Sequence, residues 1–324
     1  MLKKHHLNKG IRLLQSSSSS LAENKSVLRL GRSKRWSEEF IKAALFLCAS
    51  ISVLTTFAIV WILIQEAGVF FREVPVSDFL FGTLWTPLLE PRSFGVLPLV
   101  CGTILIVVGT ALFALPVGLA TAIYMSEYAS STTRSLLKPI LEVLAGIPTV
   151  VYGYFALTFI TPLLREVYPE VQIFNAASAS IVVGIMILPM VASLCDDTLR
   201  AVPDSLRQGG YAVGATRCEV TIGVVVPSSL SGIMASFVLA LSRAIGETMA
   251  VTLAAGATPN MTLNPLESIQ TMTAYIVQVS LGDTPAGGIE YQTCFAVAAL
   301  LFVMTLTMNM IGNHFIFSER RRGI

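Results

Sequence analysis

One arginine and one glutamate, Arg243 and Glu247, interrupt a long apolar stretch of the sequence, in the letters LSRAIGETM. An ionised side chain in the middle of a bilayer costs about 2.5–3.5 kcal/mol on insertion scales, so such residues usually have a specific role. If the helix enters the membrane near Ser228, Arg243 lies roughly 22 Å along it at a rise of about 1.5 Å per residue. The sequence therefore predicts a full positive charge deep inside the membrane.

Two interpretations of this pair are open. On a continuous helix, Arg243 and Glu247 are one turn apart on one face and could neutralise each other as a structural ion pair. Alternatively, both line a water-filled path, in which Arg243 attracts an anion while Glu247 holds the guanidinium and limits how tightly the anion binds. Glu142, near the start of another apolar stretch, is a secondary candidate for the path or an ordinary interfacial carboxylate.

The elements that must position these residues are membrane helices. Of the 324 residues, 54% are hydrophobic and 13% are charged, and the mean hydropathy is +0.71, which excludes a soluble enzyme. A net charge of +2 gives no indication of nucleic-acid binding. The fold class predicted is all-α: a polytopic membrane protein with six transmembrane helices. The predicted spans are 43–65, 96–124, 139–161, 176–195, 228–256 and 292–317.

Lysine and arginine are unevenly distributed between the predicted loops. Most of them fall at the two termini and in the even-numbered loops, so the positive-inside rule predicts that both termini are cytoplasmic, with lipid around the spans. The outer loop 257–291 contains no lysine or arginine. The predicted organisation is a disordered basic tail 1–40, a first membrane helix 41–65, an extracytoplasmic loop 66–95, a core 96–317 with the other five spans, and a basic C-terminus 318–324.

Sequence motifs for enzymatic chemistry are missing from the chain. It contains no G-x-x-x-x-G-K-[ST] phosphate loop, no H-E-x-x-H and no G-x-S-x-G, so ATP would have to be hydrolysed by another subunit. The five cysteines show no C-x-x-C spacing and are interpreted as packing residues. The sequence therefore predicts neither a catalytic residue nor a metal or other cofactor.

The predicted cytoplasmic loop 195–227 is too long for a simple connection. Asp204 or Ser205 can cap a helix, Gly214 can end it, and Pro227 can begin the chain into the fifth span. The loop is either a solvated connection or an element that docks in a groove of a partner protein. Composition alone favours neither alternative.

The same loop resembles the cytoplasmic loop of inner-membrane permeases of ATP-binding-cassette (ABC) importers. That family has an E-A-A pattern, then three residues, a glycine, nine residues and I-x-L-P. The matching residues here are Gln208, Gly209, Gly210, Gly214 and Pro227. The glycine-to-proline spacing agrees with the family, but Gln-Gly-Gly replaces the opening Glu-Ala-Ala. The resemblance implies a type I importer permease fold in which this loop carries the coupling helix.

Three further motifs resemble the phosphate-specific permeases of this family. They are AIYMSEYA at 122–129, LAGIPTVVYG at 144–153 and SRAIGETMAV at 242–251, and the last resembles the PstC-type subunit more than the PstA-type. The resemblance implies import of inorganic phosphate across a prokaryotic plasma membrane. It also implies a PstA-like second permease, two PstB-like ATP-binding subunits and a PstS-like extracytoplasmic phosphate-binding protein. In that family, the residues matching Arg243 and Glu247 belong to the phosphate pathway.

Three alternatives remain at this stage. The first is a permease for another oxyanion such as sulfate or molybdate, which one arginine does not exclude. The second is a membrane scaffold that binds a cytoplasmic partner through 195–227 and transports nothing. The third is an ion-coupled carrier that works alone, although such carriers ordinarily show a repeat between their halves.

Overall fold

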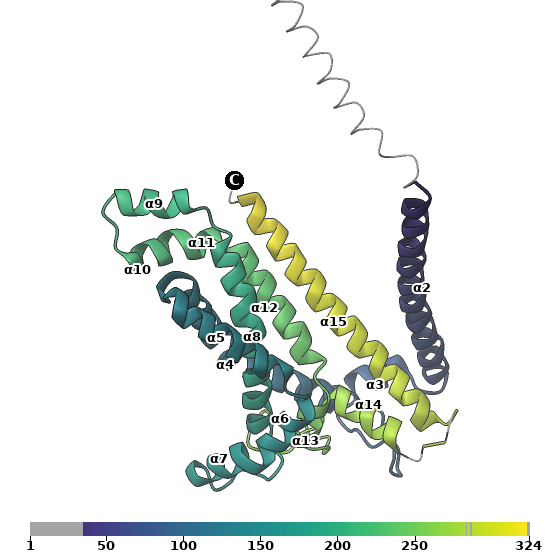
Figure 1. Ribbon diagram of the computed structural model, residues 1–324. Helices are drawn as coiled ribbons and strands as arrows, with labels where there is room; N and C mark the ends of the chain where they lie inside the picture. Colours follow the sequence, from purple (N-terminus) through teal and green to yellow (C-terminus); the bar gives the residue numbers. More distant parts are fainter. Residues whose placement is uncertain (1–34, 283, 286, 323–324) are drawn as a thin grey trace, which may run out of the picture. The chain divides into compact units, whose positions relative to one another are not determined.

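The computed structural model describes residues 35–282, 284–285 and 287–322, with side chains for 38–282, 284–285 and 287–314. All regular elements in these residues are helices, apart from one isolated bridge between Trp85 and Phe94 (Figure 1). The chain divides into two compact units, residues 1–62 and 63–324. The first 34 residues of the predicted tail lie outside the described part of the chain.

Helix α2 (Arg35–Glu73) contains the first span and is longer than predicted. It begins inside the predicted tail 1–40 and continues past position 65, into the predicted loop 66–95. Large apolar side chains such as Phe46 and Leu54 are exposed along its length. A helix that is apolar on all sides and long enough to cross about 30 Å of hydrocarbon is typical of a membrane span.

The central helices α4 and α8 pack closely against each other because small residues on each face bulky residues on the other. A methyl group added at Gly118 of α4 would lie 2.6 Å from a methyl of Val191, and one at Gly184 of α8 would lie 2.7 Å from the ring of Phe113. Small residues allow membrane helices to approach in this way. The helices from α3 to α8 are α3 (Val76–Phe81), α4 (Leu97–Ile123), η1 (Tyr124–Tyr128), α5 (Ser131–Gly146), α6 (Thr149–Phe155), η2 (Ala156–Ile160), α7 (Thr161–Val167) and α8 (Ala176–Arg200).

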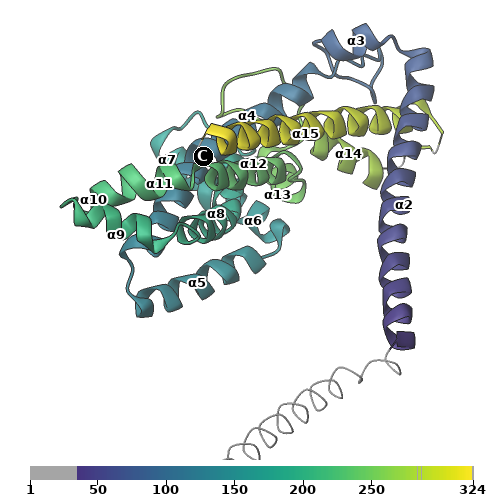
Figure 2. The same cartoon turned by 90° about the horizontal axis from the view of Figure 1, so that it is seen from above.

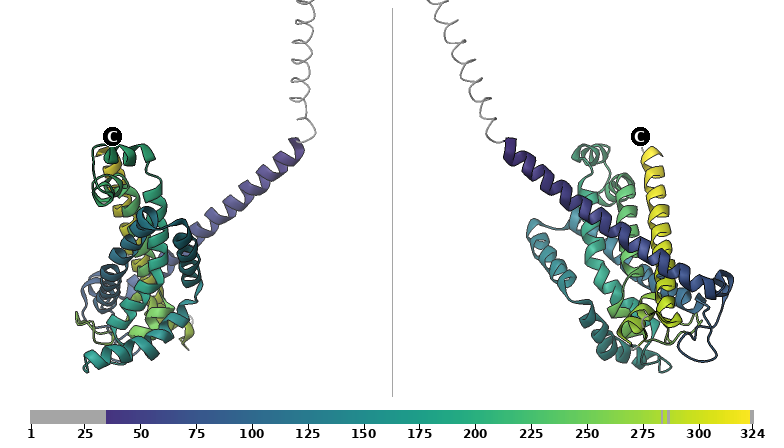
Figure 3. Two further views of the ribbon diagram at one scale, coloured as in Figure 1. Left: turned by 60° about the vertical axis from the view of Figure 1, so that its left-hand side comes forward. Right: turned by 90° about the vertical axis from the view of Figure 1, so that its right-hand side faces the viewer.

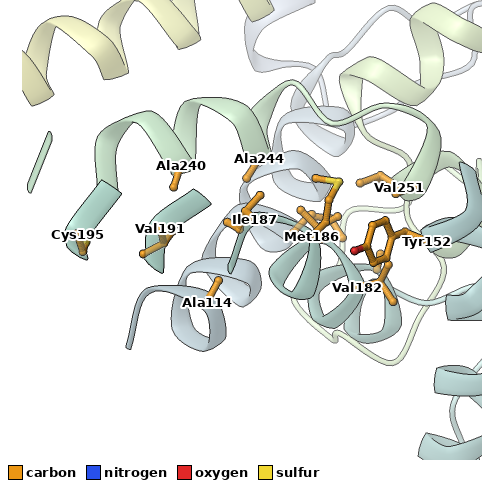
Figure 4. Packing of buried hydrophobic residues seen from close by; sticks show 14 of the residues in the cluster. Ala114, Tyr152, Val182, Met186, Ile187, Val191, Cys195, Ala240, Ala244 and Val251 are labelled. Atoms are coloured by element: carbon orange, nitrogen blue, oxygen red, sulfur yellow. The ribbon is translucent and has the colours of Figure 1, made fainter. Parts of the chain in front are cut away.

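The main apolar core is built on α8, with side chains from the helices around it. Val182 and Ile187 are fully buried there (Figure 4). Ala240 and Ala244, on the helix that follows the predicted coupling loop, are at most 2% exposed. A second cluster joins the end of α2 to the loop before α4, where the ring of Trp85 lies 4.8 Å from that of Tyr275. These contacts hold the membrane helices of residues 63–324 together.

The third and fifth predicted spans differ from the observed helices. The segment 139–161 is not one helix, because α5 ends at Gly146 and Pro148 precedes α6. The segment 228–256 is also broken: the chain bends by 69° near Ser229, and a later break ends the following helix at Ile245. The described residues contain five helices able to cross a membrane, or six if the bent pair counts as one span. The helices from α9 onward are α9 (Asp204–Ala212), α10 (Arg217–Val220), η3 (Thr221–Val225), α11 (Val226–Ser228), α12 (Leu230–Ile245), α13 (Met249–Ala255), α14 (Met272–Leu281) and α15 (Ile289–Arg322).

Within residues 63–324, the elements of the predicted coupling loop lie together at one end of the bundle. Helices α9, α10 and α11 occupy this end, which we call the α9 end, whereas α7 and α13 lie at the opposite end (Figure 1). Seen along the bundle, α5 lies beside α8 and outside the central helices (Figure 2), and α15 runs next to α12 (Figures 1 and 3). Arg243 and the loop residues are therefore on elements joined directly through α11 and α12.

Candidate functional site: an unpaired arginine and a coupling loop

Arg243 lies in the last turn of α12, and its side chain is exposed on the surface of this chain. Among the described residues, no carboxylate or other hydrogen-bond acceptor contacts its guanidinium. The neighbouring Ser242 does have a partner, since its hydroxyl donates to Asn309 Oδ1 of α15 at 2.7 Å. The next residue, Ala244, is buried against α8. Helix α12 therefore contacts α15 through Ser242 and α8 through Ala244, whereas the side chain of Arg243 is exposed.

Glu247 does not lie on the same helix as Arg243. Helix α12 ends at Ile245, Gly246 follows, and α13 begins at Met249. The predicted one-turn spacing on a common helical face is therefore wrong, and no ion pair joins the two residues. This overturns both the sealed ion pair and the idea that Glu247 holds the guanidinium.

Glu247 instead stabilises the chain at the break between α12 and α13. It is only 9% exposed, and its Oε1 accepts the backbone N–H of Ala250 at 3.3 Å, in the first turn of α13. Its carbonyl oxygen accepts the hydroxyl of Thr273 at 2.8 Å, from the start of α14. Broken helices inside a membrane need such partners, because lipid offers none for the freed backbone groups. The carboxylate is a capping group at a discontinuity in the fifth span.

Glu142 lies on α5, outside the helix that forms the third span. Its side chain is exposed and lines a hollow of about 700 Å³ at the α9 end, together with Arg134, Lys138 and Arg200. Arg243 is not part of this hollow. The structure thus separates Glu142 from the other two residues that were predicted to form one path.

The predicted coupling loop forms a compact helical pair. Helix α9 is preceded by Pro203, so neither Asp204 nor Ser205 is its cap. Gly214 has a φ of +86° after α9, a conformation that favours glycine, and its N–H donates to the carbonyl of Tyr211 at 3.0 Å. Thr216 and Glu219 then form a capping box at the start of α10.

The residues that match the family pattern occupy different environments in this pair. Gln208 and Gly209 are exposed on α9, whereas Gly210 faces α10, where an added methyl would lie 2.9 Å from a methyl of Val220. Pro227 is in the short α11 and is exposed. The exposed side of α9 is therefore available to a partner, while Gly210 is needed for close packing within the pair.

Two arginines of the loop contact the end of the second span, a relationship that the sequence patterns did not predict. Arg207 of α9 donates to Glu127 at 3.0 Å, and the guanidinium carbon of Arg217 lies 5.2 Å from the ring centre of Tyr128. Glu127 and Tyr128 both lie in η1, a π-helical turn that continues α4. The available signal was a carboxylate, Glu127, at the end of an apolar span.

Within the described residues, the site thus consists of an arginine without a partner beside a broken membrane helix and a helical loop with an exposed face. Residues 114–322 match the family described as the binding-protein-dependent transport system inner membrane component. The chain belongs to this family. It is therefore an inner-membrane transport permease with several membrane-spanning helices.

Relatives with known names support this assignment. The chain is 34% identical over 245 residues to the probable ABC transporter permease protein YqgH of Bacillus subtilis, covering 76% of this chain and 78% of that protein. It is 32% identical over 269 residues to the phosphate transport system permease protein PstC of Haemophilus influenzae, covering 76% and 82%. The PstC protein of Mesorhizobium japonicum is 30% identical over 256 residues, covering 73% and 77%.

Solved structures support the fold. A bacterial ABC transporter that imports the acidic polysaccharide alginate matches with a TM-score of 0.63 at 16% identity, covering 89% of this chain and 98% of that chain. The MetNI methionine ABC transporter in an inward-facing conformation matches with a TM-score of 0.53, covering 69% and 94%. The predicted ABC importer permease fold is confirmed.

Proposed function

We propose that this chain is a membrane-spanning subunit of an ATP-driven importer that moves inorganic phosphate from the extracytoplasmic side into the cytoplasm. The observation that carries the proposal is the unpaired guanidinium of Arg243 at the break in the fifth span, in a family with relatives named PstC. An arginine in a membrane is stabilised by an anion, and its planar set of donors suits the oxygens of phosphate.

In this proposal, the phosphate path lies between two permease subunits. Arg243 is on the surface of the single chain, so a second, PstA-like permease must cover that surface to form a closed path. Glu247 acts indirectly, by holding the break that leaves Arg243 at the end of α12. Glu142 is left out of the path, because it lies on α5 beside Lys138.

The loop 195–227 transmits the conformational change of the ATP-binding subunits to the membrane helices. One of two PstB-like ATP-binding subunits contacts the exposed side of α9 around Gln208 and Gly209, and closure of the two subunits moves α9. This shifts the equilibrium between two conformations of the membrane helices. In this proposal a PstS-like protein delivers phosphate to the outer face. Both termini lie in the cytoplasm, an orientation that the excess of lysine and arginine on one side supports.

The test is radiolabelled phosphate uptake by proteoliposomes that contain the complete assembly, with and without ATP inside. We expect uptake only with ATP, and loss of at least 90% of it in the Arg243→Gln variant. The matched control is Arg72→Gln, which also removes one exposed positive charge, at the end of α2. Normal uptake by a correctly assembled Arg243→Gln variant would remove Arg243 from the path.

The same assay separates the alternatives. Competition by a tenfold excess of unlabelled sulfate or molybdate would indicate a permease for another oxyanion. A complete assembly without ATP-dependent uptake of any of the three anions would favour the scaffold. Uptake by this chain alone, driven by an ion gradient, would favour the solitary carrier.

A further inference from the structure

A hollow of about 700 Å³ lies between the start of α5 and the end of α8, at the α9 end of the bundle. Its charged lining consists of Arg134, Lys138, Glu142 and Arg200, and the hydroxyl-bearing Ser130 and Ser131 border it. It is separate from Arg243 and from the exposed side of α9. Neither the import proposal nor the coupling loop gives this hollow a role.

The hollow has more positive than negative charge. Asp196 of α8 has a side chain that is only 2% exposed, and it accepts Arg134 Nη2 at 2.6 Å and Arg200 Nε at 3.2 Å. One buried carboxylate therefore forms ion pairs with two arginines. Lys138 adds a further cation one turn along α5, and Glu142 adds one carboxylate a turn beyond it. An anion that enters this hollow meets an excess of cations.

Several donors in the hollow remain without acceptors. Arg134 uses only Nη2 among the described residues, and its Nε is buried without a hydrogen-bond partner. Arg200 uses only Nε, and Lys138 has no hydrogen bond to any described residue. Arg134 Nε has almost no accessible surface, so an anion in the hollow would bind the remaining donors. An arginine carries five N–H donors and a lysine three, so Arg134, Arg200 and Lys138 each keep donors for such an acceptor.

The geometry points to a binding site for a phosphate group, and we propose this as its ligand. A phosphate group presents several acceptor oxygens and a negative charge, which suits two arginines, a lysine and hydroxyls that converge from different directions. The group bridges α5 through Arg134 and Lys138 to α8 through Arg200. It would therefore tie α5 to the end of α8, only a short loop before α9.

Two sources supply this chemistry. One is the headgroup of an anionic phospholipid, for which basic pockets between membrane helices are suited. The exposed residues Leu136, Ile140 and Val143 on the outer side of α5 place an apolar, lipid-compatible surface on the same helix. The other source is inorganic phosphate at the α9 end. The site does not depend on which anion the importer carries.

The experiment uses the full-length chain carrying Arg243→Gln, so that binding at the proposed transport path does not contribute. One arm places it in nanodiscs of phosphatidylcholine with 20% phosphatidylglycerol and measures retained phosphatidylglycerol by native mass spectrometry. The other uses nanodiscs of phosphatidylcholine alone and measures binding of radiolabelled inorganic phosphate by equilibrium dialysis. Each arm compares Lys138→Gln, Glu142→Gln and the control Arg72→Gln.

The two test substitutions must act in opposite directions. Lys138→Gln removes an exposed cation and should weaken binding about fivefold, whereas Glu142→Gln removes the opposing carboxylate and should strengthen it about threefold. Arg72→Gln should have no effect. This order in the first arm identifies a lipid headgroup, and in the second, free phosphate. Any other order in both arms, or no binding in either, overturns the site, whatever the result of the uptake assay.

Discussion

Arg207 of α9 and Glu127 of η1 form an ion pair of 3.0 Å between residues 80 positions apart, with side chains only 14% and 6% exposed. The same guanidinium donates to the carbonyl of Leu199 at the end of α8 at 2.8 Å. One arginine therefore joins α9 to the ends of two membrane helices. Since both charges are largely removed from water, loss of Arg207 leaves Glu127 without an ion pair, and loss of Glu127 leaves Arg207 with only the exposed Asp204.

The first prediction concerns this buried pair. Replacing Glu127 with Ala should lower the free energy of unfolding by about 3 kcal/mol, because the largely buried Arg207 loses its carboxylate. Thermal denaturation of the purified chain in detergent measures this. Asp204→Asn is the control, since Asp204 also contacts Arg207, at 3.2 Å, but is 87% exposed, and its loss should cost under about 0.5 kcal/mol. Equal effects of the two substitutions would contradict a special role for the buried pair.

The second prediction compares the two glycines that replace alanines in the family pattern. The methyl group that Gly209→Ala adds has no neighbouring atom within 4 Å. This substitution should stabilise α9 by about 0.5–1 kcal/mol, since alanine is the better helix former. Gly210→Ala places a methyl 2.9 Å from the β-branched Val220, so the same gain should be cancelled or reversed by about 1 kcal/mol of strain. Circular dichroism during thermal unfolding distinguishes them, and similar shifts for both would refute the packing at Gly210.

The third prediction tests the turn between α9 and α10. Gly214→Ala should cost about 1–2 kcal/mol, because an L side chain at a φ of +86° is strained although no neighbouring atom lies within 4 Å. Gly214→Asn should cost less, since asparagine tolerates the left-handed region better. Unfolding measurements that find alanine as stable as glycine would exclude this turn conformation.

The fourth prediction separates the charge of Glu247 from its capping role. Glu247→Gln retains an oxygen that can accept the N–H of Ala250, so stability should change by less than about 1 kcal/mol. Glu247→Ala removes the acceptor and should cost about 1–3 kcal/mol. If Glu247 acts by capping, Gln should keep at least half of the phosphate uptake and Ala should lose most of it. Equal loss of uptake in the two variants would assign the role to the charge.

For the three residues predicted to line the phosphate path, the sequence identified the charges but not their spatial relation. Arg243 could be identified from its cost in a membrane alone, but its relation to Glu247 assumed an unbroken helix across 228–256. Helix α12 ends just before Gly246, and Glu247 accepts hydrogen bonds from Ala250 in α13 and from Thr273, 26 residues away. Similarly, the chain breaks between Gly146 and Pro148, so Glu142 lies on α5 and not on the helix of the third span. The sequence did not predict this break, because proline inside a membrane span is often tolerated.

The sequence by itself determined that this chain crosses a membrane, roughly where it does so, and to which family it belongs. A bilayer requires long apolar helices, and the family motifs are local in sequence. The tertiary structure decided which charges meet: Arg207 with Glu127, Asp196 with two arginines, and Arg243 with no described residue. Such pairings depend on the packing of helices far apart in the chain, which a local pattern does not encode.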